Sequence, residues 1–232
     1  MKVALCISGL PRSFKRTSES IYDNIINILK PDIFISTWDF KQTRDKQLQD
    51  GNLDEFYDFY EPKAFESEIW TDKTNEQFFN YSYFKNKYSR YIFNFPQSSG
   101  AMFYKIYKAN LLKSSFESIN NFKYDLVIRL RSDLLFKNKI NLNEVDYAAQ
   151  SDSIFLRTDT EHDASYSNRD WIYDQFAFGS SKSMDAYSNT FLNLDKIIIN
   201  NPRLEPEIML RENLKFENIN YLKTDTRYEI LR

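Results

Sequence analysis

Short apolar runs alternate along the chain with longer stretches whose apolar residues recur at helical spacing. Residues 3–8 form an apolar run without polar alternation, which is typical of a central parallel strand covered on both faces. The next stretch predicts a helix, capped at Thr17 or Ser18 and stopped by Pro31, with these residues on its apolar face: Ile21, Ile25, Ile28 and Leu29. A strand over residues 32–38 completes a strand-helix-strand unit, which favours a right-handed crossover and parallel strands.

The same pattern continues to the end of the chain. We expect a strand within residues 62–69, a long helix that follows Ser98-Ser99-Gly100 and runs through Ile119, and a strand over 124–136. Then follow a strand at 153–156, a strand at 171–179, a helix capped by Ser180 or Ser181, a helix starting at Glu205-Pro206-Glu207 and a last strand near 219–222. Alternating strands and helices predict an α/β fold, with a mostly parallel central sheet flanked by helices.

Length and composition favour one domain. The chain of 232 residues can bury one sizeable core, and it contains no linker rich in Pro, Gly or Ser. We therefore expect a single Rossmann-like domain over residues 1–232, with an aromatic-rich excursion at 41–97. The aromatic side chains of this excursion could wall a ligand site by stacking, although packing in the core is their commoner role.

Charge and cysteine content narrow the possible functions. A formal net charge of -2 without a long basic run disfavours nucleic acid as a main partner. Cys6 is the only cysteine, so no disulfide can form within the chain, which fits a reducing, cytoplasmic location. No apolar stretch approaches the length needed to span a bilayer, so we expect a soluble protein or one attached peripherally to a membrane.

The stretch YDLVIRLRSDLLF, residues 124–136, combines apolar and charged residues in one predicted strand. The strand period of two places Arg129, Arg131 and Asp133 on one face. Desolvation can cancel the attraction of a buried ion pair, so charges at the end of an apolar strand suggest a functional site. The alternative is a structural salt bridge. Arg129 lies farther from the carboxyl end of the strand and is the more structural of the three.

Polar residues gather at the carboxyl ends of three predicted strands, where α/β proteins bind ligands. Gly9 would let the backbone approach a ligand, and Arg12 and Arg131 could contact anionic oxygens with several donors. Asp39 could accept hydrogen bonds from a ribose or a base, and Asp133 could hold a hard divalent ion that bridges to a diphosphate. A nucleotide site is therefore expected from these residues: Ser8, Gly9, Arg12, Asp39, Arg131 and Asp133.

Four segments resemble a known family. SGLPR, ISTWD, YDLVIRLRSDLLF and DQFAFGSS are similar to segments of GT-A-type nucleotide-sugar glycosyltransferases, particularly small polysaccharide-building enzymes of bacteria and large viruses. The resemblance extends from Met1 to about Leu214. It implies a GT-A-like domain that transfers a sugar from a nucleotide-sugar donor to a hydroxyl of a glycan or polysaccharide acceptor.

The family's Asp-x-Asp motif, which binds the metal and the donor diphosphate, corresponds to Arg131-Ser132-Asp133 in this chain. Asp133 matches the second acid, and the resemblance implies that it binds Mn²⁺ or Mg²⁺. Arg131 stands in place of the first acid. An arginine could neutralise phosphate in place of the ion, so metal dependence is an open alternative.

Acceptor chemistry needs a base that deprotonates the attacking hydroxyl. By the resemblance Asp174 has this role, since family members place an acid ahead of a comparable strand, and Asp170 is its nearest competitor. The alternative for Asp174 is a hydrogen bond within its loop. Trp171 and Tyr173 could stack on a sugar or pack in the core, and Glu207 is expected to be an acid favoured by a helix N-terminus.

Two other function classes remain. Residues 9–13 also resemble the phosphosulfate-binding loop of sulfotransferases, and His162, the sole histidine, would then be the candidate base. A non-catalytic module that binds a nucleotide or a glycan would use the same residues without turnover.

Overall fold

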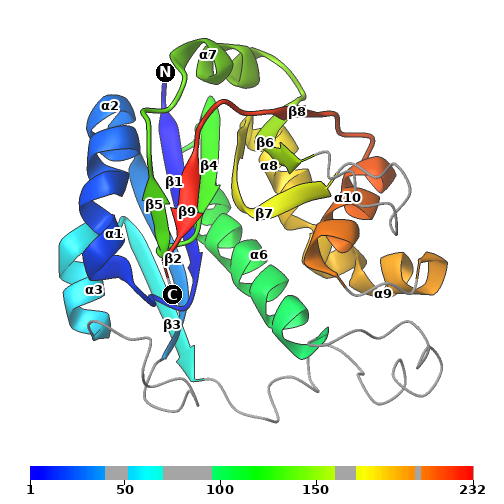
Figure 1. Ribbon diagram of the computed structural model, residues 1–232, viewed down its shortest axis with the longest axis horizontal. Coiled ribbons are helices and arrows are strands. Elements are labelled where there is room, and N and C mark those ends of the chain that lie inside the picture. Colours follow the sequence, from blue (N-terminus) through cyan, green and yellow to red (C-terminus); the bar gives the residue numbers. More distant parts are fainter. Residues whose placement is uncertain (40–51, 70–95, 160–170, 202–204, 232) are drawn as a thin grey trace.

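The computed structural model describes residues 1–39, 52–69, 96–159, 171–201 and 205–231 (Figure 1). Seven strands of these segments form the central sheet, in the order β3-β2-β1-β4-β7-β6-β8. Their bounds are β3 (Ala64–Ile69), β2 (Asp32–Asp39), β1 (Val3–Gly9), β4 (Leu126–Leu130), β7 (Trp171–Gly179), β6 (Ile154–Asp159) and β8 (Tyr221–Lys223).

The sheet is mostly parallel, as predicted, with one reversed strand. β1 pairs in parallel with β2 and β4, and β2 pairs in parallel with β3. β7 is antiparallel to both β4 and β6. The amino end of β7 therefore lies at the same edge of the sheet as the carboxyl ends of β1, β2 and β4, and it carries Asp174 to that edge.

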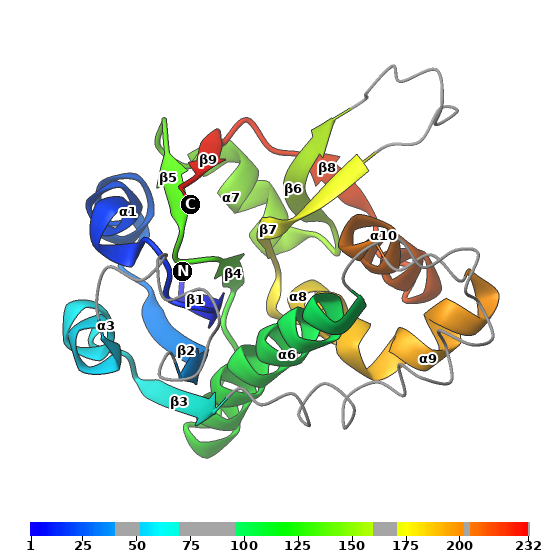
Figure 2. The same cartoon turned by 60° about the horizontal axis from the view of Figure 1, so that its bottom comes forward.

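Helices cover both faces of the sheet. One face is covered by α1 (Phe14–Ile21), the π-helix η1 (Tyr22–Ile26), α2 (Asn27–Leu29), α3 (Leu53–Tyr60) and α7 (Leu142–Gln150). The other is covered by α6 (Pro96–Ile119), α8 (Ser181–Ser188), α9 (Thr190–Asn200) and α10 (Pro206–Phe216). Figure 2 shows α6 on the opposite side of the strands from α1 and α3.

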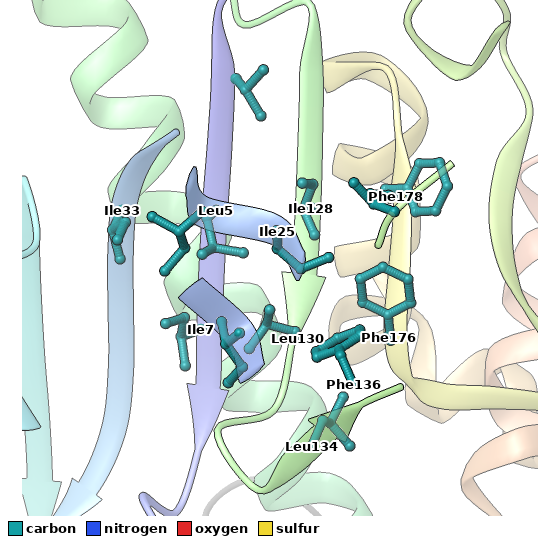
Figure 3. Close-up of a cluster of buried hydrophobic side chains, with 14 of the residues drawn as sticks. Leu5, Ile7, Ile25, Ile33, Ile128, Leu130, Leu134, Phe136, Phe176 and Phe178 are labelled. Atoms are coloured by element: carbon teal, nitrogen blue, oxygen red, sulfur yellow. The ribbon is translucent and has the colours of Figure 1, made fainter. Parts of the chain in front are cut away.

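Alternate residues of each inner strand enter two different cores. Leu5 and Ile7 of β1 belong to one cluster of buried residues with Ile25, Ile128 and Leu130 (Figure 3). Ala4 and Cys6 face α6 on the other side. Burial raises the pKa of the Cys6 thiol to about 12, so this cysteine behaves as the small buried hydrophobe that the sequence predicts.

The first helix begins earlier than the sequence predicts. It starts at Phe14, and the expected caps Thr17 and Ser18 are buried within it. Ser13 precedes the helix, but its side chain makes no capping hydrogen bond. The Ser13 hydroxyl donates instead to the carbonyl of Leu231 at 2.6 Å, a contact across 218 positions that no local pattern contains.

The predicted strand over residues 124–136 is two strands. β4 ends at Leu130, and β5 (Leu134–Phe136) pairs with β9 (Tyr228–Ile230) in a separate sheet. Arg131 and Asp133 therefore lie in a turn, and Asp133 does not continue the alternation of β4. The sequence suggested one strand because the residues on both sides of the turn are apolar. They are apolar because side chains of β4 and β5 pack in the same core.

Most other predicted elements are confirmed. The strands at 62–69 and 171–179 are β3 and β7, the long helix is α6, Ser180 caps α8, and Pro206 is in the first turn of α10. β9 was not predicted. The aromatic residues between positions 75 and 95 of the predicted excursion lie outside the described residues.

Leu130→Ala should lower the free energy of unfolding by about 2–5 kcal/mol, because it empties part of a close-packed core. Leu130 has 0% exposure, whereas Leu142 on α7 is 52% exposed. Leu142→Ala is therefore the control, with an expected change of about 0.5 kcal/mol or less. Urea unfolding followed by circular dichroism measures both. Equal losses would contradict the assignment of Leu130 to the core.

Candidate functional site

β1 ends at Gly9, which has empty space on its side-chain side among the described residues. Gly9 has a φ of +108°, in the region that favours glycine, and no atom among the described residues lies within 4 Å of where a Cβ would stand. The Thr37 hydroxyl donates to the Gly9 carbonyl at 2.8 Å and ties β2 to this turn. The Ser8 hydroxyl is buried and has no hydrogen-bond partner among the described residues. Ser8 and Gly9 thus leave polar groups and room for a ligand.

Arg131 and Asp133 form a two-point ion pair in the turn after β4. Nε of Arg131 donates to Oδ1 of Asp133 at 2.9 Å, and Nη2 donates to Oδ2 at 2.5 Å. The Asp133 side chain is 1% exposed. Arg12 reaches the same carboxylate, with Nη1 at 3.7 Å from Oδ2. Two arginines thus converge on one acid beside the end of β1.

Three further hydrogen bonds hold this turn. The Thr17 hydroxyl donates to the Ser132 carbonyl at 2.5 Å, and the Ser132 hydroxyl donates to the Leu10 carbonyl at 3.2 Å. The Leu231 amide donates to the Asp133 carbonyl at 2.9 Å. The turn is thus bonded to α1, to the loop after β1 and to the chain beyond β9. These partners are more than 90 positions away, so sequence reasoning missed them.

Asp174 is buried beside Arg129 of β4. It is 3% exposed, and its main-chain carbonyl accepts hydrogen bonds from Nη1 of Arg129 and from the Tyr187 hydroxyl. Nε2 of Gln175 donates to Oδ1 of Asp174 at 3.1 Å, while Oδ2 has no hydrogen-bond partner among the described residues. Arg129 is thus a structural partner, as expected, and it fixes the backbone of Asp174.

Asp174 also acts electrostatically on Arg131. Burial disfavours the charge of the Arg131 guanidinium, but the negative charges of Asp133 and Asp174 outweigh this effect. The pKa of Arg131 therefore lies above its ordinary value, and the side chain stays cationic. Tyr228 of β9 is bonded to the residue next to Asp174, since its hydroxyl donates to Oε1 of Gln175 at 3.3 Å. Burial, and then the charge of Asp174, raise the pKa of Tyr228.

Glu207 joins this group from α10. It lies in the first turn of the helix, as the sequence predicts for an acid favoured by the helix dipole. Burial, and then the charge of Asp174, raise the pKa of Glu207 to about 7. Sequence reasoning missed the contribution of Glu207 because the two acids are 33 positions apart and only the packing of α10 on β7 brings them together.

The predicted acceptor residues lie on the amino half of β7. Trp171 and Tyr173 are partly buried and belong to neither apolar core. The Tyr173 ring lies 4.7 Å from the Arg157 guanidinium of β6. Asp39 ends β2, two positions beyond Thr37, at the edge that Gly9 shares. Asp170 lies outside the described residues. The roles of these residues stay predictions.

The sequence predicts a Mn²⁺ or Mg²⁺ ligand at Asp133. In the described part of the chain, no three His, Cys, Asp or Glu side chains gather in one place. Both carboxylate oxygens of Asp133 accept hydrogen bonds from Arg131, whereas a hard divalent cation requires several oxygen ligands. As placed, these side chains do not fit a divalent-cation site.

Asp133→Asn should lower the free energy of unfolding by about 3 kcal/mol, because it leaves the mostly buried Arg131 without its charged partner. The control is Glu229→Gln, which removes the exposed pair between Lys137 and Glu229 at 2.9 Å. Its expected cost is at most about 1 kcal/mol. Chemical denaturation at low ionic strength measures both, and a cost at Asp133 no larger than the control would show that the pair is not structurally important.

Glu207→Gln should change how stability depends on pH. The folded-state pKa of about 7 lies above the ordinary value of 4.5, so folding favours the protonated acid. Stability should therefore fall as pH rises from 4.5 to about 7, and Glu207→Gln should reduce this fall. Melting temperatures of both proteins between pH 4.5 and 8 test the prediction. Parallel curves would contradict it.

Solved structures share this arrangement of sheet and helices. Core-mannan synthase A (CmsA/Ktr4) from Aspergillus fumigatus, in its Mn/GDP form, matches with a TM-score of 0.53 and 11% identity, over 100% of this chain and 75% of that protein. The mannosyltransferase Ktr4p from S. cerevisiae matches with a TM-score of 0.53 and 12% identity, over 97% of this chain and 70% of that protein.

No protein-family model matches the chain, and no curated protein matches it. At 11% and 12% identity, the similarity to the two solved structures concerns the fold. The chain therefore has a GT-A-like glycosyltransferase fold, and the predicted fold class is confirmed.

Proposed function

We propose that the protein is a glycosyltransferase that moves a sugar from a nucleotide-sugar donor to a hydroxyl of a glycan or polysaccharide acceptor. The observation that carries this proposal is the convergence of Arg12 and Arg131 beside the open end of β1, in a GT-A-like sheet. The two neighbours of known structure are a core-mannan synthase with Mn and GDP and a mannosyltransferase, which supports the same class of reaction. The narrower resemblance to enzymes of bacteria and large viruses stays a prediction.

Donor binding is assigned to the edge formed by β1, β2 and the turn after β4. Ser8 offers a buried hydroxyl without a hydrogen-bond partner among the described residues, Gly9 leaves the space of a side chain empty, and Arg12 lies in the following loop. Guanidinium groups bind phosphate oxygens with several donors at once. Asp39, at the end of β2, would accept hydrogen bonds from the ribose or base. This arrangement stabilises the negative charge that builds on the diphosphate as the sugar leaves.

Neutralisation of the diphosphate is assigned to Arg12 and Arg131. Arg131 is cationic and already aligned by Asp133, so it needs little rearrangement to contact an anion. A divalent ion at Asp133, suggested by the family resemblance and by the Mn/GDP form of the neighbour, is the alternative. The response to a chelator distinguishes the two.

Acceptor chemistry is assigned to the amino end of β7 and to α10. Burial, and then the charge of Asp174, raise the pKa of Glu207. Asp170 is the alternative base, next to Trp171 in the sequence. Trp171 and Tyr173 lie on the same strand, where their rings would stack against a sugar of the acceptor. The acceptor hydroxyl loses its proton to an acid of this group as it attacks the sugar.

In the described segments, no helix has the length and apolar character to cross a membrane. A cytoplasmic location and peripheral contact with a membrane stay predictions from the sequence. No observation favours nucleic acid as a partner.

A binding screen tests the proposed donor. Calorimetry against GDP-mannose, UDP-glucose, GDP, UDP and adenosine phosphosulfate should detect binding of a nucleotide sugar and its diphosphate, with and without Mn²⁺. Binding of the phosphosulfate alone would favour a sulfotransferase and overturn the proposal. Nucleotide-sugar binding without release of the diphosphate, for any acceptor glycan, would indicate a non-catalytic binding module.

Arg12→Ala should weaken binding of the nucleotide diphosphate about 10- to 100-fold, because a hydrogen bond to a charged group contributes about 1.5–3 kcal/mol. The matched control is Lys182→Ala, which removes a cation that is 75% exposed and paired with Asp152. The control should bind as the unaltered protein does. Binding that is insensitive to EDTA but lost in Arg12→Ala supports neutralisation by arginine, and the reverse result supports a metal.

A further inference from the structure

Residues 228–231, which we call the β9 segment, contact three parts of the candidate site. β9 pairs in antiparallel with β5, which begins directly after the turn that contains Arg131 and Asp133. Figure 1 and Figure 2 show β9 beside β5, with α1 on one side and β7 on the other. The segment therefore lies where it can bond the turn after β4, the loop after β1 and the amino half of β7.

Leu231 bonds two halves of the proposed donor site with its main chain. Its N–H donates to the Asp133 carbonyl at 2.9 Å, and its carbonyl accepts from the Ser13 hydroxyl at 2.6 Å. Ser13 directly follows Arg12, whose Nη1 lies 3.7 Å from Oδ2 of Asp133. The peptide groups of one residue thus connect the two stretches of backbone that carry this ion pair.

The Ser13 side chain serves this contact in place of its ordinary local one. Ser13 is the N-cap residue of α1, where a serine commonly accepts a hydrogen bond from a main-chain N–H of the first turn. Its side chain makes no such bond. The hydroxyl accepts from Nη2 of Arg16 at 3.0 Å and donates to Leu231. Places where a local rule is broken in favour of a long-range contact are often functional sites.

Tyr228 connects the same segment to β7. Its hydroxyl donates to Oε1 of Gln175 at 3.3 Å, and Nε2 of Gln175 donates to Oδ1 of Asp174 at 3.1 Å. The main-chain carbonyl of Gln175 accepts from the N–H of Arg131. Tyr228 is 4% exposed, and its ring packs 5.8 Å from that of Phe136. The β9 segment therefore contacts the turn after β4 directly and also through β7.

We propose that the β9 segment is the positioning element of the donor site, which holds Arg12 and Asp133 at the separation that donor binding requires. This inference rests on the proposed glycosyltransferase function. Ser13 and Leu231 are positioning residues, since they act through Arg12 and Asp133 and need not touch the donor. A donor that binds the site with the β9 segment in place also stabilises that placement, because such coupling is reciprocal.

The small size of this second sheet makes the coupling measurable. β9 has three residues and pairs only with β5 among the described strands, outside the central sheet. Two-stranded pairings are marginally stable on their own, so the placement of β9 depends on its contacts with the site and the core. Elements of this kind open locally at a lower free-energy cost than core strands. A ligand that needs the closed arrangement should therefore suppress the opening.

Calorimetry of Ser13→Ala with GDP and with UDP tests the positioning role. The substitution removes the hydroxyl that bonds Leu231, so it should weaken binding of the nucleotide about 5- to 10-fold, the equivalent of one hydrogen bond. The matched control is Ser18→Ala in the same helix, where a buried hydroxyl donates to the Lys15 carbonyl at 3.3 Å. The control should bind within about twofold of the unaltered protein. Equal affinities of the two variants would overturn the inference and leave the glycosyltransferase function intact.

Amide hydrogen exchange measured by NMR tests the coupling without any substitution. The same nucleotide at about 100 times its Kd should slow exchange of the Leu231 amide about 10- to 100-fold, because binding suppresses the opening that exposes this amide. The reference is the amide of Thr224, which follows the edge strand β8 and donates to the Leu156 carbonyl at 3.0 Å. Its exchange should change less than about twofold. Equal slowing of the two amides would overturn the inference.

Melting temperatures without nucleotide separate positioning from a purely structural role. A serine that only stabilises the fold would lower the melting temperature of Ser13→Ala and leave its nucleotide affinity equal to that of Ser18→Ala, which would overturn the inference. If a nucleotide binds but the Leu231 amide does not respond, the inference is wrong and the proposed function stands. If neither GDP nor UDP binds the unaltered protein, the proposed function is contradicted, and the inference fails with it.

Discussion

The pairing of Arg131 with Asp133 is the interaction on which the site depends. It lies in the turn directly after β4, beyond which β5 leaves the central sheet and pairs with β9. The same turn is bonded to α1 through Thr17 and to the loop after β1 through Ser132. A buried ion pair is weak evidence for stability by itself. Here its geometric effect is large, because it sets the position of a cation beside the open end of β1.

The reversed strand β7 supplies the second constraint. A parallel strand at this place would put its amino end at the far edge of the sheet, away from the turn after β4. The antiparallel pairing instead brings Gln175 next to Arg131. The main-chain N–H of Arg131 donates to the main-chain carbonyl of Gln175 at 3.1 Å. Asp174 then interacts with Arg129, Arg131 and Glu207 of other elements. The orientation of one strand thus decides which charges meet.

The GT-A-like fold and the chemistry of its site are separate questions, because one fold can support many activities. The neighbours of known structure share the arrangement of elements at 11% and 12% identity. This chain has an arginine where the family resemblance places the first acid of a metal-binding motif. An arginine side chain and a metal ion can both stabilise the negative charge of a leaving diphosphate. Arginine in place of the acid can therefore preserve the reaction, with the guanidinium in the role of the ion.

The sequence alone determined the α/β fold class and most elements, because these depend on the local spacing of apolar residues. It also indicated Gly9, Arg12, Arg131 and Asp133, since polar residues at strand ends are visible without coordinates. Only the tertiary structure decided that the turn after Leu130 breaks a predicted strand. Only the structure decided that α10, which carries Glu207, packs against β7, which carries Asp174. Both outcomes depend on contacts between segments far apart in the chain, and a local pattern contains no information about such contacts.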